Sequence, residues 1–435
     1  MDGDTCADFD TDSNTDSNTD LDTATNLTAR EVEPSPCRIC ASRELHRWVH
    51  LPAMPFTEEL RQPGDPVPAF LADIDVYRCA DCGVSQTIHE LELGGYYADY
   101  SYTTSSSGLA SRFMERLAEM LFTRFKLPPG CRILEVGSGD GAQLEAFRKR
   151  GGEVLGFEPS ALLCGISRAR GIPVVEGLFE EDSVSRIPDT FRQADVLLMT
   201  YTFDHLPHPA GGLAVAREAL HQERGLLVLE VHDLEHIVRR REYCLFEHEH
   251  FTYWTARTMK GMLERSGFKL LTTELLPERE RRGNSLLIVA APAAAAYQPD
   301  SSASAAGESS YAIDYDSFQG ELERGIASLD RFVEGEIAAG RTIAGYGAGG
   351  RGVMTMAAMR SARLLAYACD ANKGLHGRAA PKSFVPIAGI ERLEEQPVDT
   401  LLVFSYGYME EIVADVRSRR NAPATIISML EVLKG

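Results

Sequence analysis

The sequence predicts an α/β protein built around a doubly wound, mostly parallel sheet, with a small cysteine-containing unit before it and a second α/β unit after it. Three observations predict this fold class. Apolar runs alternate with helix-like segments between residues 132 and 290, a glycine-rich turn follows a strand at two places, and two Cys-x-x-Cys pairs precede the first turn. Strands that alternate with helices favour a parallel sheet whose ligand lies beyond the carboxyl ends of the strands.

Composition excludes several classes of function. The chain of 435 residues has a formal net charge of −20, which disfavours binding to a nucleic-acid backbone. It has no run of about 18 apolar residues, so we expect no membrane span. Its acidic N-terminus lacks the apolar core of a signal peptide. We therefore expect a cytoplasmic protein, where disulfides are rare, and a monomer is favoured.

The domain organisation follows from changes in composition along the chain. The first residues consist mainly of Asp, Thr, Ser and Asn and include the repeat TDSNTDSNTD, so they have almost nothing to bury and are expected to be disordered. An Ala-, Ser- and Pro-rich stretch later in the chain is expected to be a linker. The predicted units are an acidic tail at 1–36, a cysteine unit at 37–107, a central domain at 108–292, a linker at 293–312 and a C-terminal α/β domain at 313–435.

The cysteine unit carries the spacing of a metal site. Two residues separate Cys37 from Cys40, and two separate Cys79 from Cys82. Two such pairs are typical of a structural zinc ion held by four thiolates, with no coordination position left open for catalysis. A redox-active Cys-x-x-Cys is the alternative, but there are two copies and no thioredoxin-like unit.

The first glycine turn begins the central domain. Residues 132–136 read as a buried strand, residues 137–141 as a tight turn and residues 142–147 as the start of a helix, while Glu158 ends the next strand. An acid at that place can accept hydrogen bonds from ribose hydroxyls. The pattern E-x-G-x-G-x-G resembles motif I of class I S-adenosylmethionine (SAM) methyltransferases; a glycine turn without a ligand is the alternative. The residues expected to bind SAM are Glu135, Gly137, Gly139, Gly141, Glu158 and Thr200.

Two polar segments follow the predicted fourth and fifth strands, at residues 201–208 and 246–254. The second contains Glu-His-Glu-His at 247–250, and these side chains transfer protons near neutral pH. His248 and His250 could instead be a metal pair, although no third ligand is evident nearby in the sequence. The flanking aromatic residues favour a partly buried site over a solvated loop. A tyrosine-rich stretch at 96–107 is either a surface linker or the source of a hydroxyl in the substrate cavity.

The C-terminal unit repeats the strand-and-glycine pattern. A helix over 315–339 precedes a strand whose turn contains Gly345, Gly347 and Gly350 in the spacing G-x-G-x-x-G, and Asp370 ends the next strand. This spacing could bind a nucleotide or phosphate, could bind NAD, or could serve packing alone.

Zinc-type cysteines, a SAM domain and a C-terminal α/β domain, in this order, resemble the three-domain SAM-dependent sugar C-methyltransferases, which act on nucleoside-diphosphate keto-deoxysugars in antibiotic and polysaccharide pathways. The resemblance runs from about Pro36 to the C-terminus. The motifs that carry it lie at residues 79–86, 99–102, 205, 247–253, 283–286, 346–352 and 386–387.

The resemblance implies methyl transfer to the carbon next to the ketone of a nucleotide-linked sugar, with dTDP as the expected nucleotide. It implies that His250 is the base, that Glu249 orients it or binds the sugar, and that His205 stands near the ketone oxygen. Tyr100 or Tyr102 would bind the sugar or stabilise the enolate. The expected substrate contacts are Glu247, His248, Tyr253, Tyr346, Gly347, Gly350 and Arg351, so that the C-terminal domain holds the nucleotide.

The chain also departs from the family pattern. Glu247 stands where the family has a tyrosine, Asp204 and Tyr201 differ from the usual apolar or amide residues, and Tyr406 with Gly407 replaces a Trp-Asn pair. A carboxylate stabilises an enolate oxygen only when it is protonated. The acceptor could therefore be a different sugar or no sugar, and a SAM- or nucleotide-binding module without catalysis is the remaining alternative.

Overall fold

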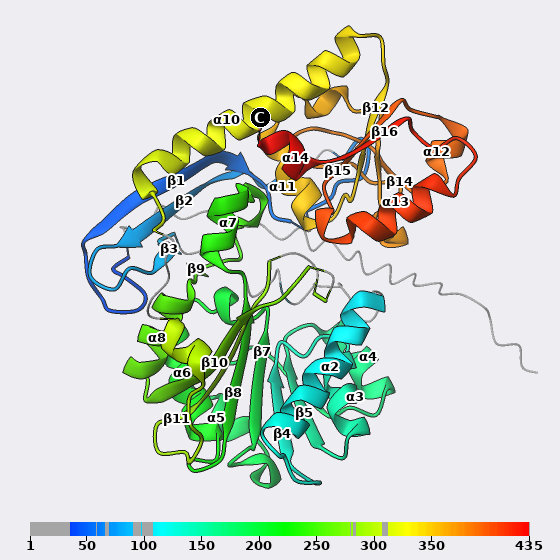
Figure 1. Cartoon of the computed structure of the whole chain (residues 1–435). Coiled ribbons are helices and arrows are strands. Elements are labelled where there is room, and N and C mark those ends of the chain that lie inside the picture. The colour runs from blue at the N-terminus through cyan, green and yellow to red at the C-terminus, as the bar shows by residue number, and fades with distance from the viewer. Residues whose placement is uncertain are drawn as a thin grey trace, which may run out of the picture.

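A computed structural model describes residues 35–57, 59–65, 69–89, 97, 108–278, 280–281, 284–306 and 312–434. Residues 1–34 of the acidic tail expected at 1–36 lie outside the described residues, as do Tyr100, Tyr102 and Gly283. The described residues form three sheets of four, seven and five strands (Figure 1).

The N-terminal sheet contains one strand from the middle of the chain. Strands β1 (Leu45–Met54), β2 (Ala72–Cys79) and β3 (Ser85–Thr87) are antiparallel, and β9 (Thr252–Tyr253) pairs with β3. Ser85 lies opposite Tyr253 in this pairing. Because β9 follows directly on residues 247–250, the N-terminal sheet fixes the end of the Glu-His-Glu-His segment.

The central sheet confirms the predicted doubly wound fold. Its order is β10-β11-β8-β7-β4-β5-β6, and only β11 runs antiparallel to its neighbours. The strands occupy apolar runs, most of them separated by helices, as predicted for residues 132–290. The bounds are β4 (Arg132–Val136), β5 (Glu153–Glu158), β6 (Val174–Glu176), β7 (Val196–Thr200), β8 (Leu226–Val231), β10 (Phe268–Leu275) and β11 (Leu286–Pro292).

Helices cover both faces of this sheet, as the continuous burial of its strands requires. Along β4, Leu134 points into the core on one face and Ile133 into the core on the other, since successive side chains alternate between faces. The helices are α2 (Gly108–Arg124), α3 (Ala142–Lys149), α4 (Ala161–Ala169), α5 (Ser183–Arg186), α6 (Pro209–Ala219), α7 (Leu234–Arg240) and α8 (Ala256–Arg265).

The C-terminal domain is a smaller parallel sheet in the order β14-β13-β12-β15-β16. The long helix α10 packs against both this sheet and β1 of the N-terminal sheet (Figure 1). The bounds are α10 (Tyr315–Ala338), β12 (Ile343–Tyr346), α11 (Gly350–Ala358), β13 (Ala368–Cys369), β14 (Ile387–Ala388), α12 (Arg392–Glu395), β15 (Thr400–Val403), α13 (Met409–Arg417), β16 (Thr425–Ser428) and α14 (Met429–Leu433).

The segment predicted to be a linker contains a short helix, α9 (Ser301–Ala305). The Asp300 side chain accepts hydrogen bonds from the backbone N–H groups of Ser302 and Ala303 and thereby caps the helix. Ala303 and Ala306 pack into the core of the central domain. Small apolar residues in a low-complexity stretch thus pack this short helix against the central domain.

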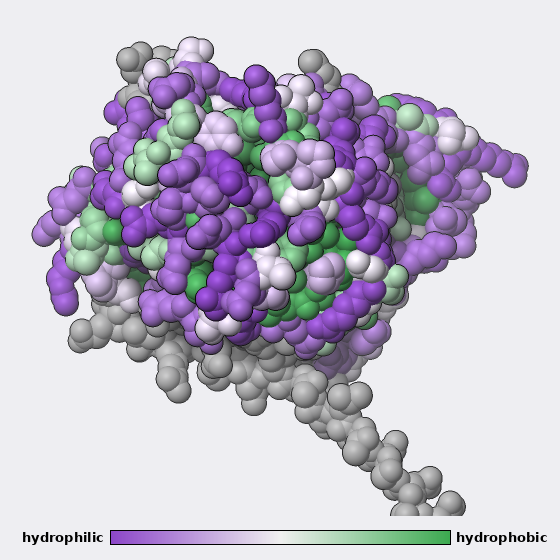
Figure 2. Space-filling view, turned by 90° about the horizontal axis from the view of Figure 1, so that it is seen from below, coloured by the Kyte–Doolittle hydropathy of each residue, from purple (hydrophilic) through white to green (hydrophobic). Residues whose placement is uncertain are grey.

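The face of the central domain opposite the C-terminal domain is mainly hydrophilic, with hydrophobic side chains gathered in separate patches (Figure 2). Across the part of the chain that the structure describes, no helix combines the length and apolarity needed to cross a bilayer.

Candidate active site

The four predicted metal ligands meet in the N-terminal domain. The Sγ atoms of Cys37 and Cys82 are 3.6 Å apart, as are those of Cys40 and Cys79, and all four lie within 4.8 Å of one another. Four thiolates around zinc at about 2.3 Å would be about 3.8 Å apart. The sulfur positions therefore fit a tetrahedral zinc ion.

The first glycine turn joins β4 to α3 and has the left-handed backbone that its glycines permit. Gly137, Gly139 and Gly141 all have positive φ. A Cβ on Gly139 would have no neighbour within 4 Å, so the space in front of this backbone is open. Glu158 accepts a hydrogen bond from the Gly139 N–H at 2.8 Å, which ties the acid to the turn. The Oε2 atom of buried Glu135 accepts no hydrogen bond from any described residue. An open backbone beside an unsatisfied carboxylate oxygen fits a polar ligand such as SAM.

The segment after β7 connects this turn to the predicted catalytic residues. Thr200 donates a hydrogen bond to Glu135 at 3.4 Å, and the Thr202 side chain lies where a Cβ on Gly137 would be. Tyr201 has a positive φ, which turns the chain into a short 3₁₀ helix, η3 (Phe203–His205). One short segment therefore contacts the glycine turn at its start and carries Asp204 and His205 at its end.

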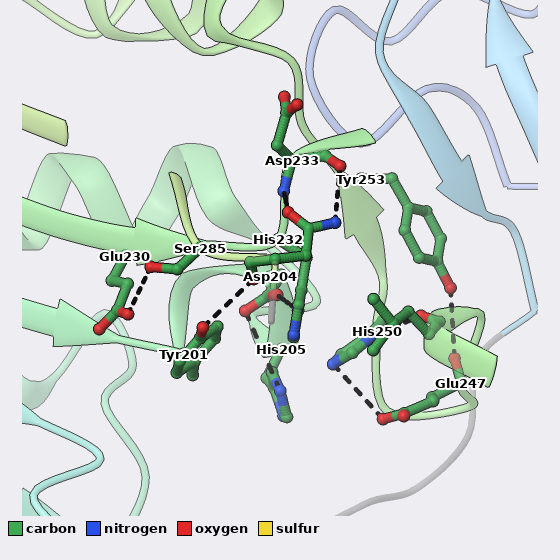
Figure 3. Close-up of polar contacts among 12 residues, drawn as sticks. Tyr201, Asp204, His205, Glu230, His232, Asp233, Glu247, His250, Tyr253 and Ser285 are labelled. Atoms are coloured by element: carbon green, nitrogen blue, oxygen red, sulfur yellow. Dashed lines mark hydrogen bonds and ion pairs between the residues drawn. The ribbon is translucent and has the colours of Figure 1, made fainter. Parts of the chain in front are cut away.

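Imidazoles and carboxylates from three segments converge beyond the carboxyl ends of β7 and β8 (Figure 3). The ring centroid of His250 is 4.8 Å from that of His205 and 5.3 Å from that of His232. His232 donates to Asp204 at 3.4 Å, and Nε2 of His250 lies 3.6 Å from Oε2 of Glu247. Asp204 and His250 are buried and the other members are mostly covered, so the charges act on one another in a medium of low polarity.

Hydrogen bonds to the backbone fix the orientation of this cluster. The Nδ1–H of His250 donates to the carbonyl oxygen of Leu245 at 2.9 Å, so the lone pair of a neutral ring is on Nε2, the atom that faces Glu247. The Asn284 side chain accepts a hydrogen bond from the Asp233 N–H at 2.8 Å and donates one to the Asp233 carbonyl oxygen at 2.9 Å. It thereby holds the backbone next to His232. These contacts preset the proton-accepting atom of the predicted base.

Burial and the neighbouring charges move the pKa values of these groups in opposite directions. Burial raises the pKa of Glu247. Burial would lower the pKa of His250, but the carboxylates of Glu247, Asp204 and Glu249 outweigh it and raise that pKa. Burial lowers the pKa of His205 to about 3. Burial would raise the pKa of Asp204. The hydrogen bond from His232 and the nearby imidazoles outweigh burial and hold that pKa well below its usual range. Glu247 and His250 therefore compete for one proton, while His205 is neutral.

The other residues of the Glu-His-Glu-His segment point to different places. Glu249 accepts a hydrogen bond from the Thr57 hydroxyl of the N-terminal domain. His248 points away from the cluster, because its Nε2–H donates to the Met54 carbonyl at 2.9 Å and its ring packs on Phe56. This position favours packing over the substrate contact expected for His248. The hydroxyl of Tyr253 is 3.4 Å from the Glu247 carbonyl oxygen.

The tyrosine-rich stretch reaches the cluster through its single described residue. The Tyr97 hydroxyl is hydrogen-bonded to Nδ1 of His205 at 2.8 Å. The predicted residues Tyr100 and Tyr102 lie outside the described residues.

The C-terminal glycine turn approaches the same segment. A Cβ built on Gly350, the first residue of α11, would lie 3.5 Å from Thr57 and 4.0 Å from the Glu247 carboxylate. Arg351 stacks on Tyr406, with 5.1 Å from its guanidinium carbon to the ring centroid. All three domains therefore supply residues around Glu247.

Packing explains part of the second glycine pattern. A Cβ on Gly345 would overlap Phe404, one on Gly347 would overlap Ser405, and one on Gly352 would overlap the Gly347 carbonyl oxygen. A Cβ on Gly349 would have no neighbour within 4 Å. Burial raises the pKa of Tyr346 to about 12, so its hydroxyl stays protonated. The turn thus combines packing glycines with one open position.

Comparison with known proteins identifies the family. A methyltransferase domain model matches residues 108–273, and a C-methyltransferase C-terminal domain model matches residues 280–430. The chain belongs to the SAM-dependent C-methyltransferases. It is 27% identical over 388 residues to the C-methyltransferase NovU of Streptomyces niveus. The aligned residues cover 87% of this chain and 91% of NovU. The central domain accordingly has the class I SAM methyltransferase fold, and the protein is a SAM-dependent methyltransferase.

Two solved structures that resemble this C-methyltransferase each match less than half of it. The PH0226 protein of Pyrococcus horikoshii OT3 has 16% identity and a TM-score of 0.37, with 46% of this chain and 98% of that chain covered. The magnesium protoporphyrin IX methyltransferase of Synechocystis PCC 6803 with bound SAH has 14% identity and a TM-score of 0.34, with 45% and 90% covered.

Sequence reasoning missed two members of the site. His232 follows directly after β8, the same kind of position that drew attention to residues 201–208 after β7, so its signal was present. Thr57 had no such signal, because its position next to Glu249 depends on the docking of the N-terminal domain.

Proposed function

We propose that this C-methyltransferase removes a proton from the carbon next to the ketone of a nucleotide-linked keto-deoxysugar, with dTDP as the nucleotide, and methylates that carbon from SAM. One observation carries the proposal: the segment from Thr200 to His205 contacts the glycine turn of the SAM site at one end and the Glu247–His250 cluster at the other. Methyl donor and proton acceptor are then neighbours, as a carbanion that must react before it is reprotonated requires.

The proton acceptor would be the pair of Glu247 and His250. Nε2 of His250 has a free lone pair when the ring is neutral, because Leu245 holds Nδ1–H, and Glu247 can take up the same proton 3.6 Å away. Glu249, positioned by Thr57, would orient the sugar. His205 would lie near the ketone oxygen and is itself oriented by Tyr97. SAM supplies an electrophilic methyl group, and these residues supply binding and proton transfer.

The C-terminal domain would hold the nucleotide. Its turn at Gly349 and Gly350 is open on one side and meets Glu247 and Thr57 on the other. The N–H groups at the start of a helix favour a diphosphate, and Arg351 adds a positive charge. Tyr346 and Gly347 would line the same turn. We further propose that Cys37, Cys40, Cys79 and Cys82 hold a structural zinc ion, since their sulfur spacing fits tetrahedral thiolate coordination.

The experiment is methyl transfer with ¹⁴C-methyl SAM and a dTDP-4-keto-deoxysugar, followed by mild acid hydrolysis and mass spectrometry. A label that stays on the sugar carbon skeleton supports the proposal. If the label is found only on an oxygen or nitrogen atom of an acceptor, the proposed C-methylation is wrong. The alternative is then methylation of another natural-product substrate.

A further inference from the structure

Three potential metal ligands meet in the active site, and they come from three separate segments. Asp204 lies in η3 after β7, His232 follows β8, and His250 ends the Glu-His-Glu-His segment (Figure 3). One carboxylate oxygen and one nitrogen from each imidazole all lie within 4.8 Å of one another. The sequence alone offered His248 as the partner of His250, but the structure turns His248 away and brings Asp204 and His232 in.

Two details of hydrogen bonding favour a cation at this place. The Nδ1–H of His250 donates to a backbone carbonyl at 2.9 Å, the arrangement that orients most metal-binding histidines and leaves Nε2 for the metal. The Asp204 side chain is only 4% exposed, yet its Oδ1 accepts no hydrogen bond from any described residue. A buried carboxylate oxygen without a hydrogen bond is costly unless a cation satisfies it.

We propose that Asp204, His232 and His250 bind one divalent transition-metal ion, with a coordination position open to the ketone of the substrate. Two imidazoles and a carboxylate are donors that suit zinc, iron(II) or manganese, and three protein ligands with an open position are typical of catalytic sites. The proposal rests on the function proposed above and adds a Lewis acid that polarises the ketone.

This ion also accounts for Glu247. An ionised Glu247 beside the substrate cannot donate a hydrogen bond to an enolate oxygen. A cation on the ketone oxygen supplies that stabilisation as a Lewis acid. With Nε2 of His250 on the metal, Glu247 is the member of the pair that takes the proton.

The electrons and atoms balance without a further reactant. Glu247 takes the proton from the carbon next to the ketone, and the electron pair of that C–H bond becomes the enolate. The enolate carbon bonds to the methyl group of SAM, and the electron pair of the methyl–sulfur bond stays on sulfur, which leaves S-adenosylhomocysteine. The Glu247 proton then passes to solvent.

The test loads the full chain with Co²⁺ after removal of bound metal, and measures metal per chain together with the absorption spectrum. We expect two Co²⁺ ions, one with the intense thiolate bands of the cysteine site and one with the weaker bands of nitrogen and oxygen ligands. His232→Ala should lose only the second ion, while SAM binding measured by calorimetry shows that the fold is intact. The exposed His208, changed to alanine, is the matched control and should keep both ions.

The wild-type protein provides a second measurement that needs no variant. A chelator that removes only the second ion should lower methyl transfer at least 100-fold, and Co²⁺ or Mn²⁺ should restore it. One Co²⁺ per chain with thiolate bands only would overturn the metal proposal, as would full methyl transfer by protein without the second ion. That last outcome would leave the proposed function standing, whereas two bound ions without transfer to any keto-sugar would remove the proposed function and keep the site.

Discussion

Nε2 of His250 lies 3.6 Å from Oε2 of Glu247, at a place bordered by residues of all three domains of the chain. Because the Leu245 carbonyl fixes the ring of His250, this distance places the Glu247 carboxylate beside the point that Nε2 faces. The substrate carbon would have to lie beside this pair and also in line with the methyl group above the glycine turn. The predictions below test separate parts of that arrangement.

Replacing His250 with alanine should reduce turnover by about 10²–10⁴-fold, because it removes a proton-transfer or metal-binding nitrogen from the cluster. The affinity for SAM, measured by calorimetry, should be unchanged, since the ring lies beyond the glycine turn. His208→Ala serves as the control and should keep full activity. Normal turnover by the His250 variant would remove this residue from the reaction.

Glu247→Gln keeps the shape of the side chain but removes its ability to accept a proton. We expect kcat to fall by about 10²-fold or more, with SAM affinity and Co²⁺ content unchanged. Glu247→Asp should retain part of the activity. Single-turnover rates with a deuterated substrate carbon would show whether proton removal is the slowed step; a wild-type rate for the glutamine variant would contradict the role.

Glu158→Ala should weaken SAM binding by about 10- to 100-fold, because a buried carboxylate that accepts ribose hydroxyls contributes about 1.5–3 kcal/mol. The same acid bonds the Gly139 and Ser160 N–H groups, so the glycine turn should also become looser. Calorimetry with SAM measures the loss, and hydrogen exchange at the turn measures the loosening. An unchanged dissociation constant would place the ribose elsewhere.

The C-terminal glycine turn offers a matched pair of substitutions. Gly352→Ala should lower stability by about 1–3 kcal/mol, because its Cβ would overlap the Gly347 carbonyl oxygen. Gly349→Ala should leave the melting temperature unchanged, since nothing lies within 4 Å of its Cβ, but should raise KM for the nucleotide-sugar. If Gly349→Ala leaves KM unchanged, the nucleotide does not bind at this turn.

Cys79→Ser should remove the thiolate-bound metal and lower the melting temperature, because the four thiolates tie the ends of the N-terminal sheet together. Activity should fall with it, since β3 of that sheet pairs with β9 directly after His250. Zinc content and thermal unfolding would be measured together. A variant with unchanged melting temperature and activity would show that the cysteines have no structural role.

The strands and the glycine turn could be predicted because their signals are local. Leu134 and Val136 belong to a short apolar run, which predicts a buried strand. The glycines that follow permit the positive φ angles of a tight turn. The same logic found His205 and His250, which lie in the polar segments that follow two predicted strands. The domain boundaries and the residue roles remain predictions.

The partners of these residues could not be predicted, because they depend on how distant segments pack. Thr57 meets Glu249 only because the N-terminal domain docks through β9, and Tyr97 meets His205 across more than one hundred residues of chain. The sequence predicts Asp204 only as part of a polar segment and as a departure from a family pattern, because its place beside two imidazoles depends on the fold.

The most direct test of the central claim uses SAM labelled with ¹³C in its methyl group and a dTDP-linked 4-keto-deoxysugar, with the product examined by NMR. The account predicts a ¹³C-methyl resonance coupled to a sugar carbon next to the ketone, retained after mild acid, and absent with Glu247→Gln. A methyl resonance on oxygen or nitrogen, or no label on any keto-sugar while SAM is bound, would contradict it.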